Sequence, residues 1–218
     1  MATFSREQRH GRLDDHGRSQ TDFFRTHGYA PAPLLVQALI TYDCPLRCSH
    51  CLAGGCDTNE TIMPLSLFES VAQQVASLNV PELLLTGGEP LSHPEMPAII
   101  ESLRKHHISW TLNTAAMPDK AAKKAMESCP PSFVAVSLDG PALVHDSFRG
   151  LNGSHEAALE SIHYFSGLAD YGVAAGTTVT TMNFPYLEET FNIVLASGAS
   201  SWGIHLLVPE GRARTRTD

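Results

Sequence analysis

Short apolar runs alternate with longer amphipathic segments along most of the chain. The apolar runs predict six strands, at 34–42, 82–86, 110–113, 133–138, 173–181 and 202–208. The segments between them repeat apolar residues at helical spacing and predict five helices, at about 66–79, 94–106, 118–128, 155–171 and 186–196. Near-continuous apolar strands that alternate with helices are typical of an α/β fold with a parallel sheet. The pattern alone fits both a partial (β/α) barrel and an open, doubly wound sheet.

Two of these helices carry a local start signal. Ser66 is followed three residues later by Glu69, which matches a capping box and predicts that the helix at 66–79 begins at the serine. Pro118 suits the first turn of a helix, because proline has no N–H to leave unpaired there. The helix at 118–128 is therefore expected to begin at the proline.

Polar residues follow the first four predicted strands, at the point where each strand ends. Cys44 follows the first strand and Gly87-Gly88-Glu89-Pro90 follows the second. Asn113 ends the third strand, and Ser137 and Asp139 lie at the end of the fourth. Because the carboxyl ends of parallel strands share one edge of the sheet, these segments are expected to converge there.

The composition indicates a folded domain and excludes several classes of protein. The chain has 218 residues, of which 43% are hydrophobic and 17% charged, so it can build a sizeable core. Its net charge of −8 disfavours nucleic-acid binding, which needs a basic face. The sequence has no apolar run of 18 residues, and residues 1–20 lack the apolar core of a secretory signal. We therefore expect a cytoplasmic protein without a nucleic-acid or membrane partner.

Four of the five cysteines lie within thirteen residues, at Cys44, Cys48, Cys51 and Cys56. In a reducing compartment such crowding favours metal or cluster binding over disulfides. The gaps of three and two residues let the first three thiolates turn toward one centre. On a four-iron cluster they would leave one iron open to a small chelating molecule. A zinc knot completed by His50 or Cys56 fits the spacing equally well.

Together these motifs resemble the radical S-adenosylmethionine (SAM) superfamily. The Cx3Cx2C motif and TGGEPL (86–91) carry the resemblance. VSLDGP (136–141), HDSFRG (145–150) and LLVPEGRA (206–213) are similar to members with a C-terminal SPASM or twitch extension, which mature peptides, sulfatases or the quinone cofactor PQQ, or modify haem-pathway tetrapyrroles. PLLVQALITYDCPLRCSHC (33–51) is similar to the PQQ-peptide and haem-pathway members. The resemblance covers about 33–213 and implies a partial (β/α)6 barrel.

The resemblance also implies cofactors and ligands. Cys44, Cys48 and Cys51 would hold a [4Fe–4S] cluster whose open iron binds SAM. The implied SAM contacts are Gly87, Gly88 and Glu89 at the methionine part, Ser137 near the ribose and Arg149 at the carboxylate, with Asn113 as a further candidate on the same edge of the sheet. One electron from flavodoxin or ferredoxin would split SAM into methionine and a 5′-deoxyadenosyl radical, which takes a hydrogen atom from a peptide or tetrapyrrole-like substrate. No further catalytic residue is predicted.

Several residues also have simpler interpretations. Asp139 fits an Asx turn before a proline as well as it fits a role in the site. Arg149 fits a surface ion pair, and Glu89 taken alone fits a solvated loop acid. His205 is expected to pack as a core histidine rather than to face the barrel interior. Cys129 is expected to be a buried, inert thiol.

The chain departs from the family pattern in two respects. His50 stands where Tyr or Phe is common, which would change the packing over the adenine, and Cys56 lies outside the motif and is expected to be free. We expect a polar extension at 1–33, a core domain at 34–210 and a short basic tail at 211–218. Without a cysteine-rich extension the chain is expected to be truncated, a fragment or a minimal core. The alternative function is a non-catalytic remnant or a zinc-binding interaction module.

Overall fold

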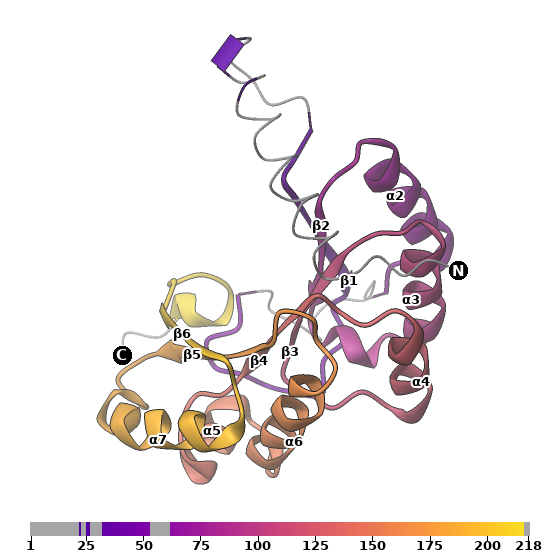
Figure 1. The fold of residues 1–218 in the computed structure, drawn as a ribbon. Helices are drawn as coiled ribbons and strands as arrows, with labels where there is room; N and C mark the ends of the chain where they lie inside the picture. The colour runs from indigo at the N-terminus through magenta and orange to yellow at the C-terminus, as the bar shows by residue number, and fades with distance from the viewer. Residues whose placement is uncertain (1–21, 23–24, 27–31, 53–61, 216–218) are drawn as a thin grey trace.

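The structure is a computed structural model that describes residues 22, 25–26, 32–52 and 62–215. Strands and helices alternate along this part of the chain (Figure 1). The strands are β1 (Leu35–Thr41), β2 (Glu82–Gly87), β3 (Trp110–Thr114), β4 (Phe133–Ser137), β5 (Val173–Val179) and β6 (Ser201–Leu206). The α-helices are α2 (Leu65–Ser77), α3 (Met96–Lys105), α4 (Lys120–Ser128), α5 (Ala142–Arg149), α6 (Ser154–Ser166) and α7 (Leu187–Ser197). Short 3-10 helices lie at Pro90–Ser92, Phe184–Tyr186 and Gly211–Thr215.

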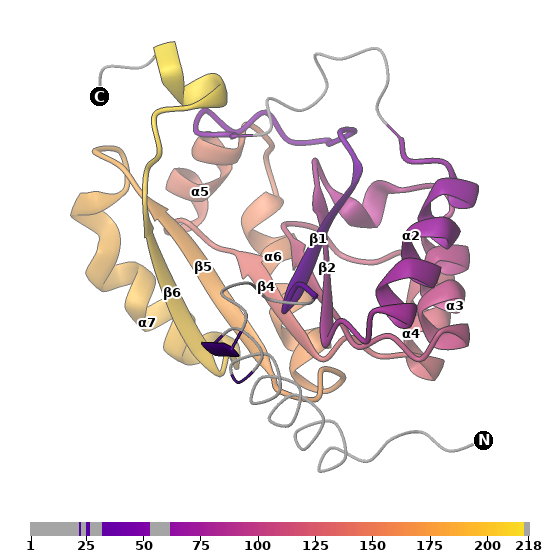
Figure 2. The ribbon, with the colours of Figure 1, turned by 90° about the horizontal axis from the view of Figure 1, so that it is seen from above.

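The six strands form one parallel sheet in the order β1-β2-β3-β4-β5-β6. Each strand pairs with the next along the chain, and both views show the helices on the outer side of a curved sheet (Figures 1 and 2). A doubly wound sheet would reverse its strand order at a switch point, whereas this order never reverses. The predicted α/β fold is therefore confirmed, and of the two architectures it is the partial (β/α)6 barrel.

The two faces of the sheet have different character. Alternate side chains point toward the helices and form the core, as Leu83 and Leu85 of β2 do with no exposed surface. Burying one such side chain fully contributes about 1.5–3 kcal/mol. The concave face carries polar side chains near the carboxyl ends of four neighbouring strands, namely Thr86, Asn113, Ser137 and Thr178. One face is therefore apolar core and the other ends in a polar rim.

Helix α2 does not begin with the predicted capping box. Its first residue is Leu65, and Pro64 at the N-cap provides no side-chain hydrogen bond. The Glu69 carboxylate instead reaches α3, where it accepts hydrogen bonds from Ser102 Oγ at 2.5 Å and Lys105 Nζ at 2.8 Å. The capping-box prediction is wrong because a neighbouring helix supplies the partners of this carboxylate.

One further helix and two helix boundaries differ from the prediction. Helix α5 was not predicted, because it follows Pro141 directly and its eight residues span little more than two turns. Helix α6 ends before Gly167, not at 171. Helix α4 begins after Asp119, whose side chain accepts a hydrogen bond from Ala122 N–H at 2.7 Å, so Pro118 lies just outside the helix.

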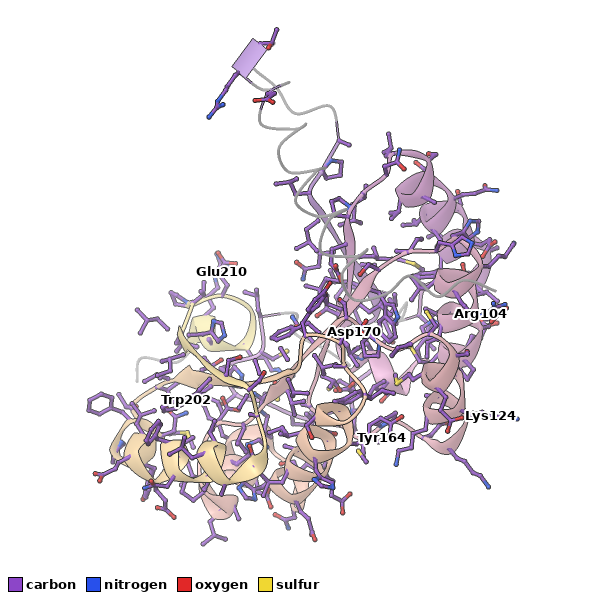
Figure 3. The ribbon with its side chains drawn as sticks, viewed as in Figure 1. Arg104, Lys124, Tyr164, Asp170, Trp202 and Glu210 are labelled. Atoms are coloured by element: carbon purple, nitrogen blue, oxygen red, sulfur yellow. The ribbon has the colours of Figure 1, made fainter. Side chains whose placement is uncertain are left out.

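Charged side chains lie on the outer side of α3 and α4. Arg104 of α3 and Lys124 of α4 extend away from the sheet (Figure 3). Arg104 pairs with Glu101 one turn earlier on the same helix, at 2.5 Å. No helix in the described part of the chain is both long and apolar enough to cross a membrane.

Some predictions fall on residues outside the described ones. They concern Cys56, most of the polar extension at 1–33 and the last three residues of the tail at 211–218. Cys129, which is described, packs against the core but stays partly exposed, and its carbonyl oxygen accepts a hydrogen bond from Trp110 Nε1 at 3.3 Å. The proposed domain boundaries remain predictions.

Candidate cofactor site at the carboxyl edge of the sheet

A cavity of about 620 Å³ lies at the carboxyl ends of the strands. All nine residues predicted from the sequence contribute to its wall: Cys44, Cys48, Cys51, Gly87, Gly88, Glu89, Asn113, Ser137 and Arg149. They come from the loop after β1, the end of β2, the ends of β3 and β4, and the last residue of α5. The expected convergence at one edge of the sheet is therefore present in the structure.

The loop with the three cysteines is fastened to the end of α5. Arg47 N–H donates to the carbonyl oxygen of Arg149 at 2.8 Å, and Ser49 N–H donates to that of Phe148 at 3.3 Å. Cys48 is buried, and Cys44 and Cys51 are half-buried in the same apolar cluster. The three thiols therefore lie on one wall that a neighbouring helix holds in place.

Burial shapes the chemistry of these thiols. It raises the pKa of Cys44 to about 11, with Glu89 and the other two thiols adding to the effect. Burial also raises the pKa of Cys48, although the positive charge of Arg149 opposes it. Both thiols are therefore protonated at neutral pH when no metal is bound, and binding a metal would release their protons.

The part of the chain that the structure describes offers no complete site for a single metal ion. Among the described residues no group of three or more His, Cys, Asp or Glu side chains is arranged to hold a metal ion. The ring of His50, one proposed ligand of a zinc knot, stacks on Phe148 with 4.2 Å between the centroids and 8° between the planes. Cys56, the other proposed ligand, lies outside the described residues.

Gly87 and Gly88 let the end of β2 lie directly against the segment after β1. Gly88 N–H donates to Thr41 O at 2.7 Å, and Glu89 N–H donates to Asp43 O at 2.9 Å. A Cβ atom at Gly87 would overlap the carbonyl oxygen of Thr41, and one at Gly88 would overlap that of Asp43. Glycine is required at both positions because backbone approaches backbone there. The close approach that these two glycines allow is therefore between two backbone segments of the protein, the end of β2 and the end of β1 with the residues after it.

Glu89 is buried and fully engaged with the next strand. Its carboxylate accepts hydrogen bonds from Thr114 Oγ1 at 2.7 Å, Ala115 N–H at 2.8 Å and Leu91 N–H at 3.0 Å. Burial raises the pKa of Glu89, while these donors act in the opposite direction. The interpretation as a solvated loop acid is therefore wrong, since only 1% of the residue is exposed.

Arg149 and Asp139 form a buried ion pair beside Cys48. Asp139 Oδ2 accepts from Arg149 Nε at 2.6 Å and from Nη2 at 2.5 Å. Arg149 is 7% exposed, so the interpretation as a surface ion pair is wrong. An Asx turn is excluded as well, because Pro141 has no N–H and Asp139 Oδ1 accepts from Thr178 N–H at 2.8 Å. The remaining amino group of Arg149 lies 3.8 Å from Cys48 Sγ.

Two histidines near the site behave differently from each other. Burial and the charge of Arg149 lower the pKa of His50 to about 4, so its ring is neutral at pH 7 and packs as an aromatic group. His205 is exposed, so its predicted core position is wrong. It pairs in register with Thr178 on β5, whose side chain lines the cavity, and so it lies on the concave side at the sheet edge.

Several residues at this cavity were not predicted from the sequence. Thr114 supports Glu89, and Thr178 both supports Asp139 and lines the wall. Extending the alternation of Asn113 and Ser137 to the fifth strand would have predicted Thr178. Arg212, which lies in the last 3-10 helix and donates its N–H to Cys51 O at 3.0 Å, has no such signal in the sequence.

Comparisons with known proteins agree with this geometry. A profile of the radical SAM superfamily matches residues 39–194. The AdoMet-dependent heme synthase of Oleidesulfovibrio alaskensis is 29% identical over 199 residues, which are 84% of this chain and 48% of that protein. The AdoMet-dependent heme synthase of Methanosarcina barkeri is 32% identical over 189 residues, which are 83% of this chain and 52% of that protein. The chain therefore spans about half the length of these relatives.

A solved structure shares the fold. SuiB of Streptococcus suis, bound to its precursor peptide SuiA, superimposes with a TM-score of 0.74 at 14% identity, over 94% of this chain and 47% of SuiB. The matched profile describes an enzyme family that uses a [4Fe–4S] cluster and SAM, so the predicted cofactors are those of the family. Since this profile spans most of the chain and includes the cysteine motif, the GGEP segment and α5, the chain belongs to the radical SAM superfamily.

Proposed function

We propose that this chain is a catalytic core that cleaves SAM reductively and starts a radical reaction on a second substrate. One observation carries the proposal. The three cysteines of the Cx3Cx2C motif and the Gly87–Glu89 segment, from different parts of the chain, border the same cavity of about 620 Å³. A zinc-binding module would need neither this cavity nor the second segment beside it.

The residues present fit a [4Fe–4S] cluster. Three soft thiols, Cys44, Cys48 and Cys51, belong to one loop, and no fourth thiol among the described residues borders the cavity. When bound and reduced, such a cluster supplies one electron to the SAM sulfonium, giving methionine and a 5′-deoxyadenosyl radical that takes a hydrogen atom from the substrate. The protein holds the thiols on one wall and keeps water from most of their surface.

We place SAM in the same cavity. The proposed contacts, all on its wall, are Gly87, Gly88, Glu89, Asn113, Ser137 and Arg149. A carboxylate offers about four acceptor sites, and Glu89 uses three on its own protein, so one remains for the SAM ammonium. Arg149 would present its cation to the SAM carboxylate. Ser137 and Asn113, at neighbouring strand ends, would lie near the ribose.

We propose a tetrapyrrole of the haem pathway as the substrate class. The support is that two relatives called heme synthases align with more than four fifths of this chain. A peptide is the second candidate, because SuiB, which shares the fold, was crystallised with its precursor peptide. An acidic one-electron carrier such as flavodoxin or ferredoxin would reduce the cluster, and the reducing cytoplasm is the proposed location.

Anaerobic reconstitution with iron and sulfide tests the proposal. We expect about four irons per chain and a brown chromophore that dithionite bleaches. Adding SAM should then release 5′-deoxyadenosine, measured by mass spectrometry. Cys48→Ala should abolish this product, whereas Cys129→Ala, which removes a thiol that does not line the cavity, should leave it unchanged. A colourless protein that holds one zinc would contradict the proposal.

The substrate class needs a separate experiment. The loaded protein is incubated with SAM, reductant and either a carboxylate-bearing porphyrin or a panel of short peptides. If the substrate is a tetrapyrrole, only the porphyrin should increase the release of 5′-deoxyadenosine, and only the porphyrin should change in mass. A mass change confined to a peptide would move the assignment to peptide maturation while leaving SAM cleavage intact.

A further inference from the structure

The ion pair of Asp139 and Arg149 lies inside the protein, where charges are costly. Asp139 has no exposed surface, and its carboxylate accepts two hydrogen bonds from Arg149 and one from Thr178 N–H. Taking two charges out of water is costly, and their mutual attraction often repays no more than that cost. Stability alone is therefore a weak reason for this pair, and its position suggests another.

The backbone of Asp139 is held as firmly as its side chain. Its N–H donates to Nδ1 of the buried His145 at 3.0 Å, and its carbonyl oxygen accepts from Asn183 Nδ2 at 2.9 Å. The residue cannot turn without breaking several hydrogen bonds. It forms a rigid support for the guanidinium of Arg149.

The rest of that guanidinium faces a proposed cluster ligand. Arg149 Nη1 lies 3.8 Å from Cys48 Sγ, and the carbonyl oxygen of Arg149 accepts from Arg47 N–H in the cysteine loop. The guanidinium of Arg149 is thus fixed beside the sulfur of Cys48 through Nη1, while its other two nitrogens bind the carboxylate of Asp139.

We infer that the Arg149–Asp139 pair sets the reduction potential of the cluster, with Asp139 as the positioning residue that holds Arg149 against Cys48. This inference rests on the proposed function. A cluster gains negative charge when it is reduced, and hydrogen bonds and charges at its sulfurs help to set its potential. Arg149 stabilises the reduced state, and Asp139 limits the size of that effect while fixing its geometry.

Opposite charge changes test the inference. Arg149→Gln and Asp139→Asn are reconstituted without SAM, and their midpoint potentials are measured by titration followed with electron paramagnetic resonance. Arg149→Gln should shift the potential to more negative values and Asp139→Asn to more positive values. The double variant should lie between them. Asp146→Asn is the matched control. Asp146 lies on α5 together with Arg149, but its carboxylate accepts hydrogen bonds from Gly153, Ser154 and His155 instead.

The outcomes separate an electrostatic role from a structural one. Shifts of the same sign in both variants, or no shift in either, would overturn the inference although the wild-type cluster and the proposed function stand. If a single variant takes up no iron, Arg149→Lys, which keeps the charge, is compared with the double variant. A more negative potential in the double variant supports the inference, and equal potentials overturn it.

Discussion

Glu89 and Glu69 are two acids whose carboxylates each accept hydrogen bonds from three residues, in opposite environments. Glu89 lies at the carboxyl edge of the sheet with 1% of its surface exposed, and its partners are Thr114, Ala115 and Leu91. Glu69 lies on the outer surface between α2 and α3, and about a third of its side chain is exposed. Its donors are Ser102, Lys105 and His106.

The environment gives the two carboxyl groups opposite pKa shifts. Burial dominates at Glu89 and raises its pKa, although three donors oppose the change. At Glu69 the hydrogen bond from Lys105 is the main cause of a pKa lowered to about 2. Equal numbers of partners therefore do not mean equal roles. At the carboxyl edge, the close backbone contacts at Gly87 and Gly88 and the buried carboxylate of Glu89 form a rigid frame. The α2–α3 contact is instead a surface network of charges that solvent screens.

The largest expected effect comes from breaking the frame where backbone packs against backbone. Gly88→Ala would push a methyl group into the carbonyl oxygens of Tyr42 and Asp43, which cannot move without shifting β1. We expect a loss of about 3 kcal/mol in the free energy of unfolding. Urea denaturation of the chain measures it.

Gly153→Ala is the control for this substitution. Gly153 has a φ of +83°, but a Cβ atom there would meet nothing within 4 Å. Alanine at that position should cost about 1–2 kcal/mol, from the left-handed backbone alone. If both variants lose the same stability, steric overlap at the strand ends is not the reason for Gly88.

Removing the buried acid should have the next largest effect. Glu89→Ala leaves Thr114, Ala115 and Leu91 without their acceptor, and each buried donor left unsatisfied costs about 1–3 kcal/mol unless water replaces the carboxylate. We expect a net loss of about 2 kcal/mol in urea unfolding. Glu89→Gln keeps an acceptor oxygen and should lose less.

Glu89→Gln also distinguishes a ligand role from a structural one. The variant removes the negative charge proposed to meet the SAM ammonium, so SAM should bind more weakly while cluster absorbance persists. Equilibrium dialysis with labelled SAM measures the first quantity and visible absorption the second. Parallel loss of SAM binding and of the cluster would identify Glu89 as a purely structural residue.

Most of the fold and the cavity wall could be predicted from the sequence, because their signals are local and periodic. Apolar runs located the strands, and the shared edge of a parallel sheet brought Cys44, Glu89 and Ser137 together without any knowledge of side-chain contacts. Helix α5 was missed, since eight residues after a proline give too little periodicity.

What could not be predicted depends on partners that are distant in the sequence. Ser66 and Glu69 match the local capping-box pattern, yet the carboxylate of Glu69 accepts a hydrogen bond from Ser102 on another helix. Arg149 was predicted as a SAM contact, but the sequence could not exclude a surface ion pair, because its burial follows from the position of Asp139 and the cysteine loop. His205 was assigned to the core from its apolar strand, but β6 is an edge strand and the side chain is exposed.

The smallest expected effect is that of Glu69→Gln, and pH makes it visible. The folded-state pKa of Glu69 is about 2, below its ordinary value of 4.5, so the ionised carboxylate stabilises the folded state above pH 4.5. This contribution is lost as pH falls from 4.5 toward 2. The stability difference between wild type and Glu69→Gln should therefore be small at pH 7 and shrink further in that window. Urea midpoints at pH 7, 4 and 3 measure it.

Glu89 should show the opposite sign, which completes the comparison between the two regions. Its raised folded-state pKa means that stability from the protonated acid is present below pH 4.5 and is lost as pH rises through the higher folded value. Wild type should thus gain stability relative to Glu89→Gln on acidification, while it loses stability relative to Glu69→Gln. If the stability difference between wild type and variant changes with pH in the same direction for Glu89→Gln and Glu69→Gln, burial is not the main cause of the pKa shift at Glu89.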